Sequence, residues 1–549
     1  MQLSGAQILI KELIRQGATT VFGYPGGAVL DIYDELYKNS DQIRHIISAH
    51  EQGAAHAADG YARVTGRPGV VIATSGPGAT NLVTGIANAY LDSVPMVAIT
   101  GNVAVSMLGK DSFQEVDIIG ITQPIVKHNF IVRDITELEG VIVEAFHLAQ
   151  TGRRGPVLID IPKSVQRSTC EYYGNLTPKH EYKKADYNLD EAVAAIEKCT
   201  RPFIYCGGGV VAAEAGREVL ELSEKLSAPV GLSMMGISGI PHSYPLNLGM
   251  SGMHGRYAST IAQSKADLMI AIGTRFSDRA TGQIAEYTKR CTVIHIDIDV
   301  AELGKNVSNI IEVCGDCRQI LRELIERVPK MRNQEWLDKI LPLRERDRTN
   351  PDTESFTPRN IIKHINDFAS PSTVVATDVG QHQMWVMQHY AFEQPHTLLT
   401  SGGLGTMGYG MGAAIGGCIA SGKRTILFTG DGSFGMNLNE LATAVSQRLP
   451  VLIVLLNNGV LGMVRQWQTL FYSSHYSSTT LNRATDFVAL ARAFGADGSV
   501  INSLDELDEV LASPLPSDRP YLLDCRIGMD EKVFPMIPPG GSVKDIRTS

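Results

Sequence analysis

Short apolar runs alternate with helix-length amphipathic stretches along most of the chain. The runs in its first part cover residues 19–24, 44–48, 69–74, 95–100 and 156–162. Continuous apolar runs of this kind are typical of parallel strands that are buried on both faces. Strands that alternate with helices predict a parallel sheet covered on both sides.

The same alternation restarts twice further along the chain. Runs at 202–206, 268–273 and 293–299 form a second group, and those at 424–429 and 450–456 belong to a third. A polar stretch at about 168–188 and a charged stretch at 331–354 separate the groups and are interpreted as linkers, the second with a helix. We therefore predict three doubly wound parallel α/β domains, over residues 1–167, 188–330 and 357–549. A length of 549 residues agrees, because it is too long for one core.

Composition narrows the class of protein. Apolar residues make up 44% and charged residues 19%, as in ordinary globular domains. The net charge of -9 argues against a nucleic-acid partner. We find no apolar run of membrane-spanning length and no signal peptide, so we expect no membrane association and a cytoplasmic location.

The eight cysteines are scattered, as in proteins of a reducing compartment. The single close pair is Cys314-Gly-Asp-Cys317. Such a pair can be redox-active or form half of a zinc site. Because no second Cys or His pair completes a zinc site, we interpret it as structural.

Two short polar motifs follow the apolar runs of the third group. Gly430-Asp431-Gly432 comes after the first run, and Asn457-Asn458 comes after the second. Asp431 and Asn458 should therefore lie at the carboxyl ends of two parallel strands, where open α/β sheets bind ligands. A carboxylate and an amide oxygen suit Mg²⁺, and the glycines let a phosphate approach the backbone. Each motif alone would be an ordinary turn or loop; together they predict a magnesium–phosphate site.

At this spacing the two motifs resemble the diphosphate–Mg²⁺ motif of thiamine diphosphate enzymes. Further motifs are spread over most of the chain: Phe22-Gly-Tyr-Pro-Gly-Gly-Ala28, His50-Glu-Gln-Gly-Ala-Ala, Phe113-Gln-Glu-Val-Asp117, Gly402-Gly-Leu-Gly-Thr-Met-Gly408, Gly462-Met-Val-Arg-Gln-Trp467 and Pro538-Pro-Gly540. With these segments the chain resembles the catalytic large subunits of the acetohydroxyacid synthase (acetolactate synthase) family. The Phe-Gln-Glu, Gly-Met-Val-Arg-Gln-Trp and Pro-Pro-Gly segments distinguish this family from pyruvate decarboxylases and oxidases.

The resemblance implies an activity. One pyruvate would lose CO₂, and its remaining two-carbon unit would join a second pyruvate or 2-oxobutyrate. The products would be 2-acetolactate or 2-aceto-2-hydroxybutyrate, at the first common step of branched-chain amino-acid biosynthesis. Glu51, in the first turn of a predicted helix, would stay ionised and serve as acid/base partner of the cofactor's aminopyrimidine. Gly27 and Gln114 would line the reaction site with it.

The resemblance also assigns the remaining site residues. Thiamine diphosphate would contact Pro25, Glu51, Met407, Gly430, Asp431, Gly432, Ser433, Asn458 and Met463. Mg²⁺ would bind to Asp431, Asn458 and the backbone oxygen of Val460. The 2-oxo acid substrates would meet Phe113, Lys163, Arg279, Val464 and Trp467. FAD, without a net redox role, would contact Arg153, Gly208, Gly252, Met253, His254, Gly255, Gly273, Arg275, Asp278, Arg279, Asp297 and Asp316.

The sequence departs from the family pattern at one position of the predicted FAD site: Ser277 stands where the FAD-binding branch usually has Asp. The family further implies a homodimer or a dimer of dimers, and a small regulatory subunit as partner. Two alternatives remain open. Another carboligase or oxidase of the superfamily, such as glyoxylate carboligase or pyruvate oxidase, would share the fold. A non-catalytic protein with this fold would lack Glu51 or the metal ligands, which are all present.

Overall fold

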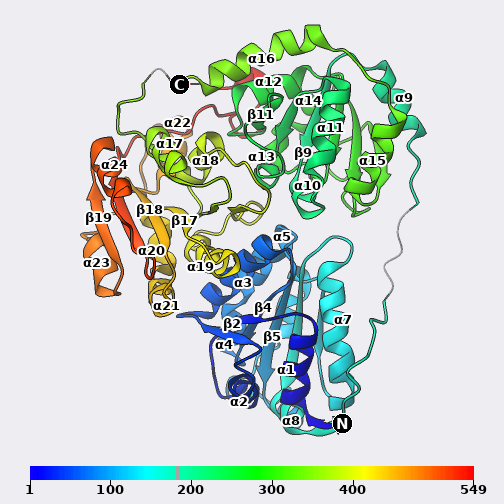
Figure 1. Ribbon diagram of the computed structural model, residues 1–549, viewed down its shortest axis with the longest axis vertical. Coiled ribbons are helices and arrows are strands. Elements are labelled where there is room, and N and C mark those ends of the chain that lie inside the picture. The colour runs from blue at the N-terminus through cyan, green and yellow to red at the C-terminus, as the bar shows by residue number, and fades with distance from the viewer. Residues whose placement is uncertain (181–185, 351, 549) are drawn as a thin grey trace.

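The computed structural model describes residues 1–180, 186–350 and 352–548. They form three α/β units, each built on a six-stranded parallel sheet with helices on both faces (Figure 1). The predicted fold class is therefore confirmed. Most of the apolar runs form strands in which nearly every residue is buried, including all of those at 69–73, 156–162 and 268–272. The strand at 44–47 is an exception, because only Ile46 is buried in it.

The N-terminal sheet has the strand order β3-β2-β4-β5-β7-β6. Its strands are β2 (Thr20–Gly23), β3 (Arg44–Ile47), β4 (Gly69–Ala73), β5 (Met96–Asn102), β6 (His128–Ile131) and β7 (Pro156–Pro162). Its main helices are α1 (Gly5–Arg15), α2 (Leu30–Lys38), α3 (Glu51–Thr65), α5 (Val83–Leu91) and α7 (Leu138–Gln150). Helix α1 begins with the capping box formed by Ser4 and Gln7.

The stretch that the sequence predicts as a first linker is partly structured. Strand β8 (Thr169–Glu171) pairs antiparallel with β1 (Gln2–Ser4), which ties this stretch back to the start of the chain. Beyond it, Glu139 of α7 accepts hydrogen bonds from the backbone nitrogens of Tyr173 and Gly174. The linker interpretation was therefore wrong for residues 169–174. Part of the rest, at 181–185, lies outside the described residues.

The central sheet has the order β11-β10-β9-β12-β13-β14. Its strands are β9 (Pro202–Cys206), β10 (Val230–Leu232), β11 (Asn247–Met250), β12 (Leu268–Ile272), β13 (Thr292–Asp297) and β14 (Ile310–Cys314). The helices around it are α9 (Asp190–Lys198), α10 (Gly208–Ala212), α11 (Gly216–Leu226), α12 (Tyr257–Lys265), α13 (Asp278–Thr281), α14 (Ile284–Tyr287) and α15 (Cys317–Arg327). Helix α16 (Gln334–Arg348), in the charged stretch, packs on α12 and buries Trp336 and Ile340.

The C-terminal sheet has the order β16-β15-β17-β18-β20-β19. Its strands are β15 (Val374–Thr377), β16 (Leu398–Leu399), β17 (Thr425–Gly430), β18 (Val451–Asn457), β19 (Asp497–Ile501) and β20 (Tyr521–Arg526). Its helices are α17 (Pro358–Phe368), α18 (Gln381–His389), α19 (Tyr409–Ser421), α20 (Asp431–Asn437), α21 (Leu441–Ser446), α22 (Gly462–Phe471), α23 (Phe487–Ala493) and α24 (Leu504–Ala512). The crossover between β17 and β18 is thus two short helices, and α20 begins at Asp431 itself.

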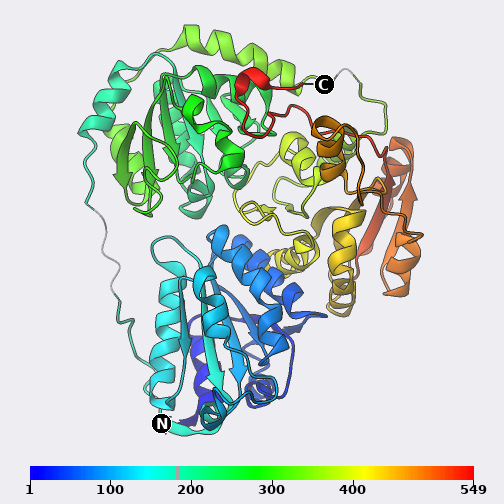
Figure 2. The same ribbon diagram turned by 180° about the vertical axis from the view of Figure 1, so that it is seen from behind.

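The C-terminal unit shares a hydrophobic core with each of the other two. One cluster of buried residues joins it to the central unit, and another joins it to the N-terminal unit. Figure 2 shows the N-terminal unit at the bottom of the molecule and the central unit at the top, with the C-terminal unit beside both. No helix in the described parts of the chain is long and apolar enough to cross a membrane.

Helices α3 and α19 form the joint between the N-terminal and C-terminal units. They approach so closely that a Cβ added at Gly416 would lie 1.9 Å from the Ala57 carbonyl oxygen. A Cβ at Gly60 would lie 2.3 Å from the Ala413 oxygen. Glycine on both helices is therefore what permits this contact.

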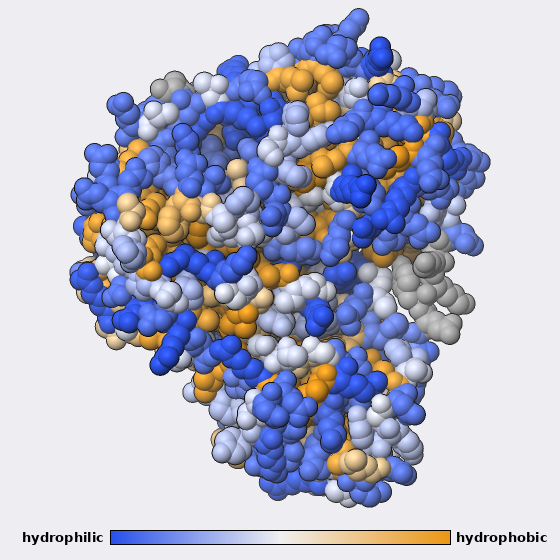
Figure 3. All heavy atoms as spheres, viewed as in Figure 1, coloured by the Kyte–Doolittle hydropathy of each residue, from blue (hydrophilic) through white to orange (hydrophobic). Residues whose placement is uncertain are grey.

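Apolar side chains also reach the surface, as Figure 3 shows in several places on one face of the molecule. The large side chains that are at least about two-fifths exposed include Tyr24, Ile47, Phe113, Leu404, Met436 and Val464. Several of these belong to the loops that carry predicted site residues.

Candidate active site

The N-terminal sheet gathers one set of predicted site residues at a single edge. Strands β2, β3, β4 and β7 are parallel, so their carboxyl ends meet at the same edge. Gly27 follows β2, Glu51 follows β3, and Lys163 follows β7 directly. The turn after β4, at residues 74–78, lies among them.

Glu51 is the first residue of α3 and is 9% exposed. Its Oε2 accepts a hydrogen bond from the Asn81 side chain, with a nitrogen–oxygen distance of 3.0 Å. Gly78 leaves room beside it, since a Cβ there would lie 3.3 Å from Glu51 Oε1. A carboxylate at a helix N-terminus is stabilised in its charged form by the helix dipole. The geometry therefore provides a carboxyl group at a helix N-terminus, held by the Asn81 side chain.

Gly27, Gln114 and Lys163 surround the same edge. The Lys163 ammonium donates to the Gly27 carbonyl oxygen at 2.8 Å. Gln114 has a positive φ of 59° and packs against Gly76, where a Cβ would lie 2.9 Å from the Gln114 Cα. Its neighbour Phe113 is 88% exposed. The predicted catalytic residues thus come together, while Phe113 projects from the surface beside them.

The C-terminal sheet gathers the second set. Asp431 follows β17, Asn458 follows β18, and the two strands pair in parallel up to Gly430 and Leu456. The Asn458 amide oxygen accepts from the Val460 nitrogen at 3.2 Å, and the amide nitrogen donates to Gln381 Oε1 at 3.3 Å. Val460 faces Thr480 in a short antiparallel bridge, whose hydrogen bonds are made by the neighbours Gly459 and Leu461. The Val460 carbonyl therefore takes no part in these bonds.

These donors suit a magnesium ion. Burial raises the pKa of Asp431 to about 6, against hydrogen bonds from nearby backbone nitrogens that lower it. A buried carboxylate of this kind gains from a cation beside it. Within the described residues no three His, Cys, Asp or Glu side chains converge on a metal position. A site here would therefore combine one carboxylate with amide and carbonyl oxygens, and Mg²⁺ takes its further ligands from phosphate and water.

A third strand end completes this edge, and our sequence analysis missed it. After β15 come Asp378 and Gly380, and helix α18 begins at Gln381. Asp378 is buried and accepts from the Gly408 nitrogen at 2.8 Å. The Ser433 hydroxyl donates to the Val379 carbonyl at 2.7 Å. The signal was present, because a short apolar run precedes Asp378 as one precedes Asp431. The free N–H groups at the start of α18 suit a phosphate.

A cavity of about 1320 Å³ lies where the three units meet. Ten of the twelve residues predicted to contact a flavin line it: Arg153, Gly208, Met253, His254, Gly273, Arg275, Asp278, Arg279, Asp297 and Asp316. Gly252 and Gly255 shape the turn that carries Met253 and His254. A Cβ at Gly252 would lie 2.8 Å from the Arg279 carbonyl oxygen, and its φ is 107°. The cavity volume exceeds that of ordinary small-molecule sites and suits a dinucleotide.

The polar lining of this cavity also fits a dinucleotide. Arg153 bonds to Glu302 at 2.8 Å and approaches Asp299 at 3.3 Å. Burial raises the pKa of Asp297 to about 6 and, together with the Arg279 charge, lowers that of His254 to about 4. Buried atoms without a hydrogen-bond partner in the described chain include the Tyr205 hydroxyl, His254 Nδ1 and Glu302 Oε2. Such groups are costly when left unpaired, so a polar ligand would satisfy them. Ser277 also lines the cavity.

The same cavity holds predicted cofactor and substrate residues of the C-terminal unit. Met407 and Met463, predicted to contact thiamine diphosphate, line it together with the predicted substrate residues Val464 and Trp467. The Arg279 guanidinium lies 5.4 Å from the Trp467 ring centroid and 3.5 Å from the Met253 sulfur. This wall offers a cation for a carboxylate beside an aromatic surface for an alkyl group.

Glu51, Gly27, Gln114, Lys163 and Phe113 are not among the residues that line this cavity. Within one chain, the predicted site is therefore divided into an N-terminal and a C-terminal half.

The Cys314–Cys317 pair takes no part in either half as a metal site. All eight cysteines are free, and burial raises the pKa of both Cys314 and Cys317. A thiol with a raised pKa is a poor nucleophile and a poor metal ligand. Our interpretation of the pair as structural agrees with these environments.

Comparisons with known proteins first define the class. Family models of thiamine pyrophosphate enzymes match all three units: the N-terminal TPP-binding domain at residues 3–121, the central domain at 189–324, and the C-terminal TPP-binding domain at 378–525. The chain is thus built as a thiamine pyrophosphate enzyme throughout.

Individual relatives narrow the class to one family. The chain is 43% identical to the acetolactate synthase large subunit of Corynebacterium glutamicum, over 100% of this chain and 90% of the relative. It is 43% identical to the acetolactate synthase isozyme 2 large subunit of Escherichia coli, over 98% of both chains. It is 44% identical to the large subunit of Parasynechococcus marenigrum, over 98% of this chain and 90% of the relative. The chain belongs to the family of acetolactate synthase large subunits.

Proposed function

We propose that this protein is an acetolactate synthase that decarboxylates pyruvate and joins the two-carbon unit to a second 2-oxo acid. With pyruvate the product is 2-acetolactate, and with 2-oxobutyrate it is 2-aceto-2-hydroxybutyrate. The observation that carries the proposal is the shared cavity, in which Met407 and Met463 lie with the Arg279–Trp467 pair. A cofactor-binding wall and a wall suited to a 2-oxo acid thus face the same space.

Thiamine diphosphate, when bound, supplies the electron sink that makes loss of CO₂ from a 2-oxo acid possible. Asp431, Asn458 and the Val460 carbonyl would hold the Mg²⁺ that neutralises its diphosphate, with Gly430, Gly432 and Ser433 at the same strand end. Met407, which lines the cavity, would contact the cofactor. Glu51 would exchange a proton with the aminopyrimidine nitrogen, and Pro25, Gly27 and Gln114 would close the site around it.

Arg279 and Trp467 divide the recognition of the second substrate between them. The Arg279 guanidinium can bind a carboxylate through two hydrogen bonds, and the Trp467 ring offers apolar contact to an alkyl group. Because one additional methyl group changes only apolar contact, the ring rather than the cation would distinguish 2-oxobutyrate from pyruvate. Lys163 and the exposed Phe113 would line the entrance, together with Val464.

FAD would occupy the remainder of the cavity, along Arg153, Gly208, Arg275, Asp297 and Asp316. The cavity volume and its unpaired polar atoms support this assignment. Since the proposed reaction has no net redox change, the flavin would serve to complete the structure. In an oxidase, by contrast, pyruvate would reduce the flavin at each turnover.

We further propose that the active unit is a homodimer, which could pair into a dimer of dimers. The support is the division of the site within one chain, because Glu51 is not among the residues that line the cavity. A second copy could bring its Glu51 edge to this chain's Asp431 edge. The exposed apolar side chains beside the Glu51 edge, Tyr24, Ile47 and Phe113, suit such an interface.

A small regulatory subunit is the expected second partner, since the relatives are named as large subunits. We also propose a cytoplasmic location. The eight free cysteines support it, because a reducing compartment keeps thiols reduced.

The test is to incubate the purified protein with pyruvate, Mg²⁺, thiamine diphosphate and FAD, and to omit each cofactor in turn. We expect acetolactate and CO₂ from the full mixture, and a loss of product when any one of the three is left out. Consumption of oxygen with bleaching of the flavin, and no acetolactate, would instead identify an oxidase.

The shared site has its own test. Glu51→Gln and Asp431→Asn should each be inactive alone. If the two residues act across subunits, co-folding the variants at equal amounts should restore roughly one quarter of wild-type activity, because half of the dimers then hold one intact site. No recovery in verified heterodimers would contradict the shared site.

A further inference from the structure

The segment 401–407 links strand β16 to helix α19 and ends at Met407, which lines the cavity. Its sequence, Ser401-Gly-Gly-Leu-Gly-Thr-Met407, contains three glycines in seven residues. A loop of this composition has many accessible backbone conformations and does not hold a shape by itself. Something outside the loop must therefore fix it if Met407 is to stay in place.

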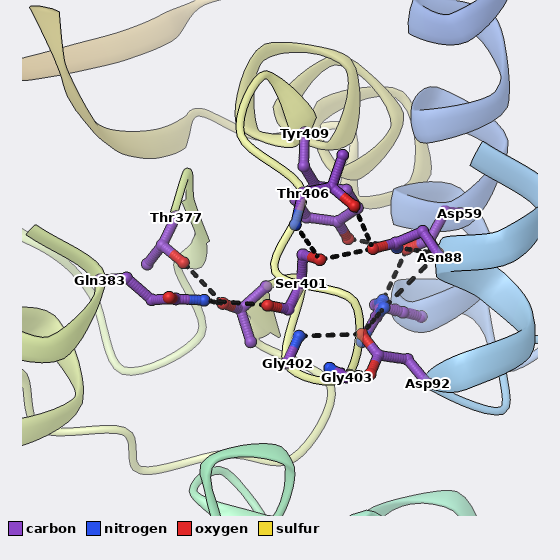
Figure 4. A network of polar contacts seen from close by, with 12 residues as sticks. Asp59, Asn88, Asp92, Thr377, Gln383, Ser401, Gly402, Gly403, Thr406 and Tyr409 are labelled. Carbon is purple, nitrogen blue, oxygen red and sulfur yellow. Dashed lines mark hydrogen bonds and ion pairs between the residues drawn. The ribbon is translucent and has the colours of Figure 1, made fainter. Parts of the chain in front are cut away.

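The N-terminal unit of the same chain supplies that support (Figure 4). Asp92, at the end of α5, accepts hydrogen bonds from the backbone nitrogens of Gly402 at 3.0 Å and Gly403 at 2.7 Å. Its side chain is fully inaccessible to solvent. Hydrogen bonds to a buried carboxylate are among the stronger ones in proteins.

Asn88, one turn earlier on α5, supports the ends of the loop. The Ser401 hydroxyl donates to its amide oxygen at 2.5 Å, and the Thr406 hydroxyl donates to the same oxygen at 3.3 Å. The Thr406 nitrogen in turn donates to the Ser401 hydroxyl at 2.9 Å. Asn88 and Ser401 are both buried, so water does not compete for these bonds.

Helix α3 fixes these two residues from behind. Arg63 donates to Asp92 at 2.9 Å and to Asp59 at 2.6 Å. Asp59 also accepts from Asn88 at 3.1 Å and from the Tyr409 hydroxyl at 2.7 Å. Burial alone would lower the pKa of Arg63, but Asp59, Tyr409 and Asp92 raise it well above its ordinary value. The network is therefore charged and connected from α3 to α19.

The loop is closely packed at two of its glycines. A Cβ on Gly403 would lie 2.9 Å from Asp92 Oδ1, and one on Gly402 would lie 2.3 Å from the Met235 sulfur of the central unit. At these two positions the loop thus packs between the N-terminal and central units, and Gly403 leaves the least room because its neighbours include the Leu91 backbone oxygen at 3.1 Å.

From this geometry we infer that Asp92 and Asn88 are positioning residues of the reaction, which hold the 401–407 loop so that Met407 stays in the cavity. Neither residue belongs to the cofactor and substrate sets described above. The inference rests on the proposed function for its kinetic consequences, but the loop restraint itself exists without any cofactor. Asp92→Asn retains the size of the side chain and removes one of the two acceptor oxygens.

The first measurement uses the protein without cofactors. Hydrogen–deuterium exchange by mass spectrometry should show faster exchange of the 401–407 segment in Asp92→Asn, by about tenfold or more. The matched control is Asp267→Asn, because Asp267 also accepts from two consecutive backbone nitrogens, those of Thr200 and Arg201. It lies outside the cavity, so it should leave exchange at 401–407 unchanged.

The second measurement uses the enzyme with its cofactors. We expect kcat of Asp92→Asn to fall by roughly 10-fold to 100-fold, while KM for pyruvate changes by about twofold at most. The near-ultraviolet circular dichroism of the bound cofactor should change in parallel. A role in overall stability alone would not separate kcat from KM in this way.

Ser401→Ala provides an independent variant if Asp92→Asn does not fold, because it removes one hydroxyl and no charge. Unchanged exchange at 401–407 in the folded variants would overturn the proposal. So would faster exchange with normal kcat, because the loop would then be restrained without consequence. If wild type makes no acetolactate, the proposed function fails, and the exchange measurement still decides whether the restraint exists.

Discussion

The contact between α3 and α19 predicts that alanine at Gly416 lowers the stability of the protein, whereas alanine at a glycine outside the contact raises it. At Gly416, a new Cβ would meet three backbone atoms: the Ala57 oxygen at 1.9 Å, the Ala57 carbonyl carbon at 2.8 Å and the Tyr61 nitrogen at 2.8 Å. Backbone atoms cannot rotate away as a flexible side chain can. The two helices would have to separate by roughly 1 Å to reach ordinary contact.

The magnitude follows from two opposing terms. Overpacking of this kind costs about 1–3 kcal/mol, and overlap with three backbone atoms places Gly416→Ala at the upper end. Alanine recovers about 1 kcal/mol of helix propensity. We therefore expect a net loss of about 2 kcal/mol, together with a weaker attachment of the N-terminal unit to the C-terminal unit.

Gly140→Ala is the control, because Gly140 lies in the first turn of α7 and its new Cβ would meet only Leu176 Cδ1, at 3.9 Å. Gly140→Ala should increase the free energy of unfolding by about 0.5–1 kcal/mol. The assay is thermal unfolding followed by circular dichroism, at matched concentration and scan rate. Gly416→Ala should melt several degrees below wild type and Gly140→Ala slightly above it. Equal melting temperatures for the two variants would refute the reasoning.

Three further predictions concern chemistry, selectivity and pH. Glu51→Gln should lower acetolactate formation by about 100-fold to 10,000-fold, since it removes an acid/base group; output near that of wild type would exclude the role. Trp467→Leu should reduce the preference for 2-oxobutyrate by about tenfold or more in a competition assay, and an unchanged product ratio would count against the pocket. Burial lowers the pKa of His45 to about 4 from its ordinary 6.5. Between these two pH values the unfolded chain binds a proton at His45 that the folded protein does not, so the free energy of unfolding decreases as the pH falls from 6.5 towards 4. His45→Gln, which keeps a partner for the Tyr33 hydroxyl, should therefore gain on wild type by up to about 2 kcal/mol between pH 7 and pH 5; parallel stability curves would disprove this.

The strand ends were the part of the site that the sequence could reveal. Asp431 and Asn458 each follow an apolar run, and parallel strands place their carboxyl ends at one edge regardless of the details of packing. Asp378 satisfies the same rule but belongs to no recognised motif, so it was overlooked. Glu51 is predicted from its place in the first turn of a helix and from the resemblance to a family.

The cavity and the loop restraint could not be predicted in the same way. The cavity is formed by all three units, and nothing in the local sequence indicates how they pack. Asp92 and Gly403 are 311 positions apart, and Asn88 and Ser401 are 313 positions apart. In the sequence Asp92 is an ordinary polar residue near a helix end. Its role depends on tertiary contacts, which neither periodicity nor composition encodes.

Helix α3 carries both a residue predicted from the sequence and residues whose contacts only the structure reveals. Its first residue is Glu51, and its third and fourth turns carry Asp59 and Arg63, which support the loop that ends at Met407. Residues 51 and 63 are separated by about 18 Å along a continuous helix, which transmits displacement with little bending. If the site is shared between subunits as proposed, Glu51 serves the partner's cofactor while Asp59 and Arg63 help to position Met407 for this chain's own. One rigid element then contributes to two active sites, so a shift of α3 at either site would be felt at the other. The network between Arg63, Asp92 and Gly402 is the physical connection on which such communication would depend.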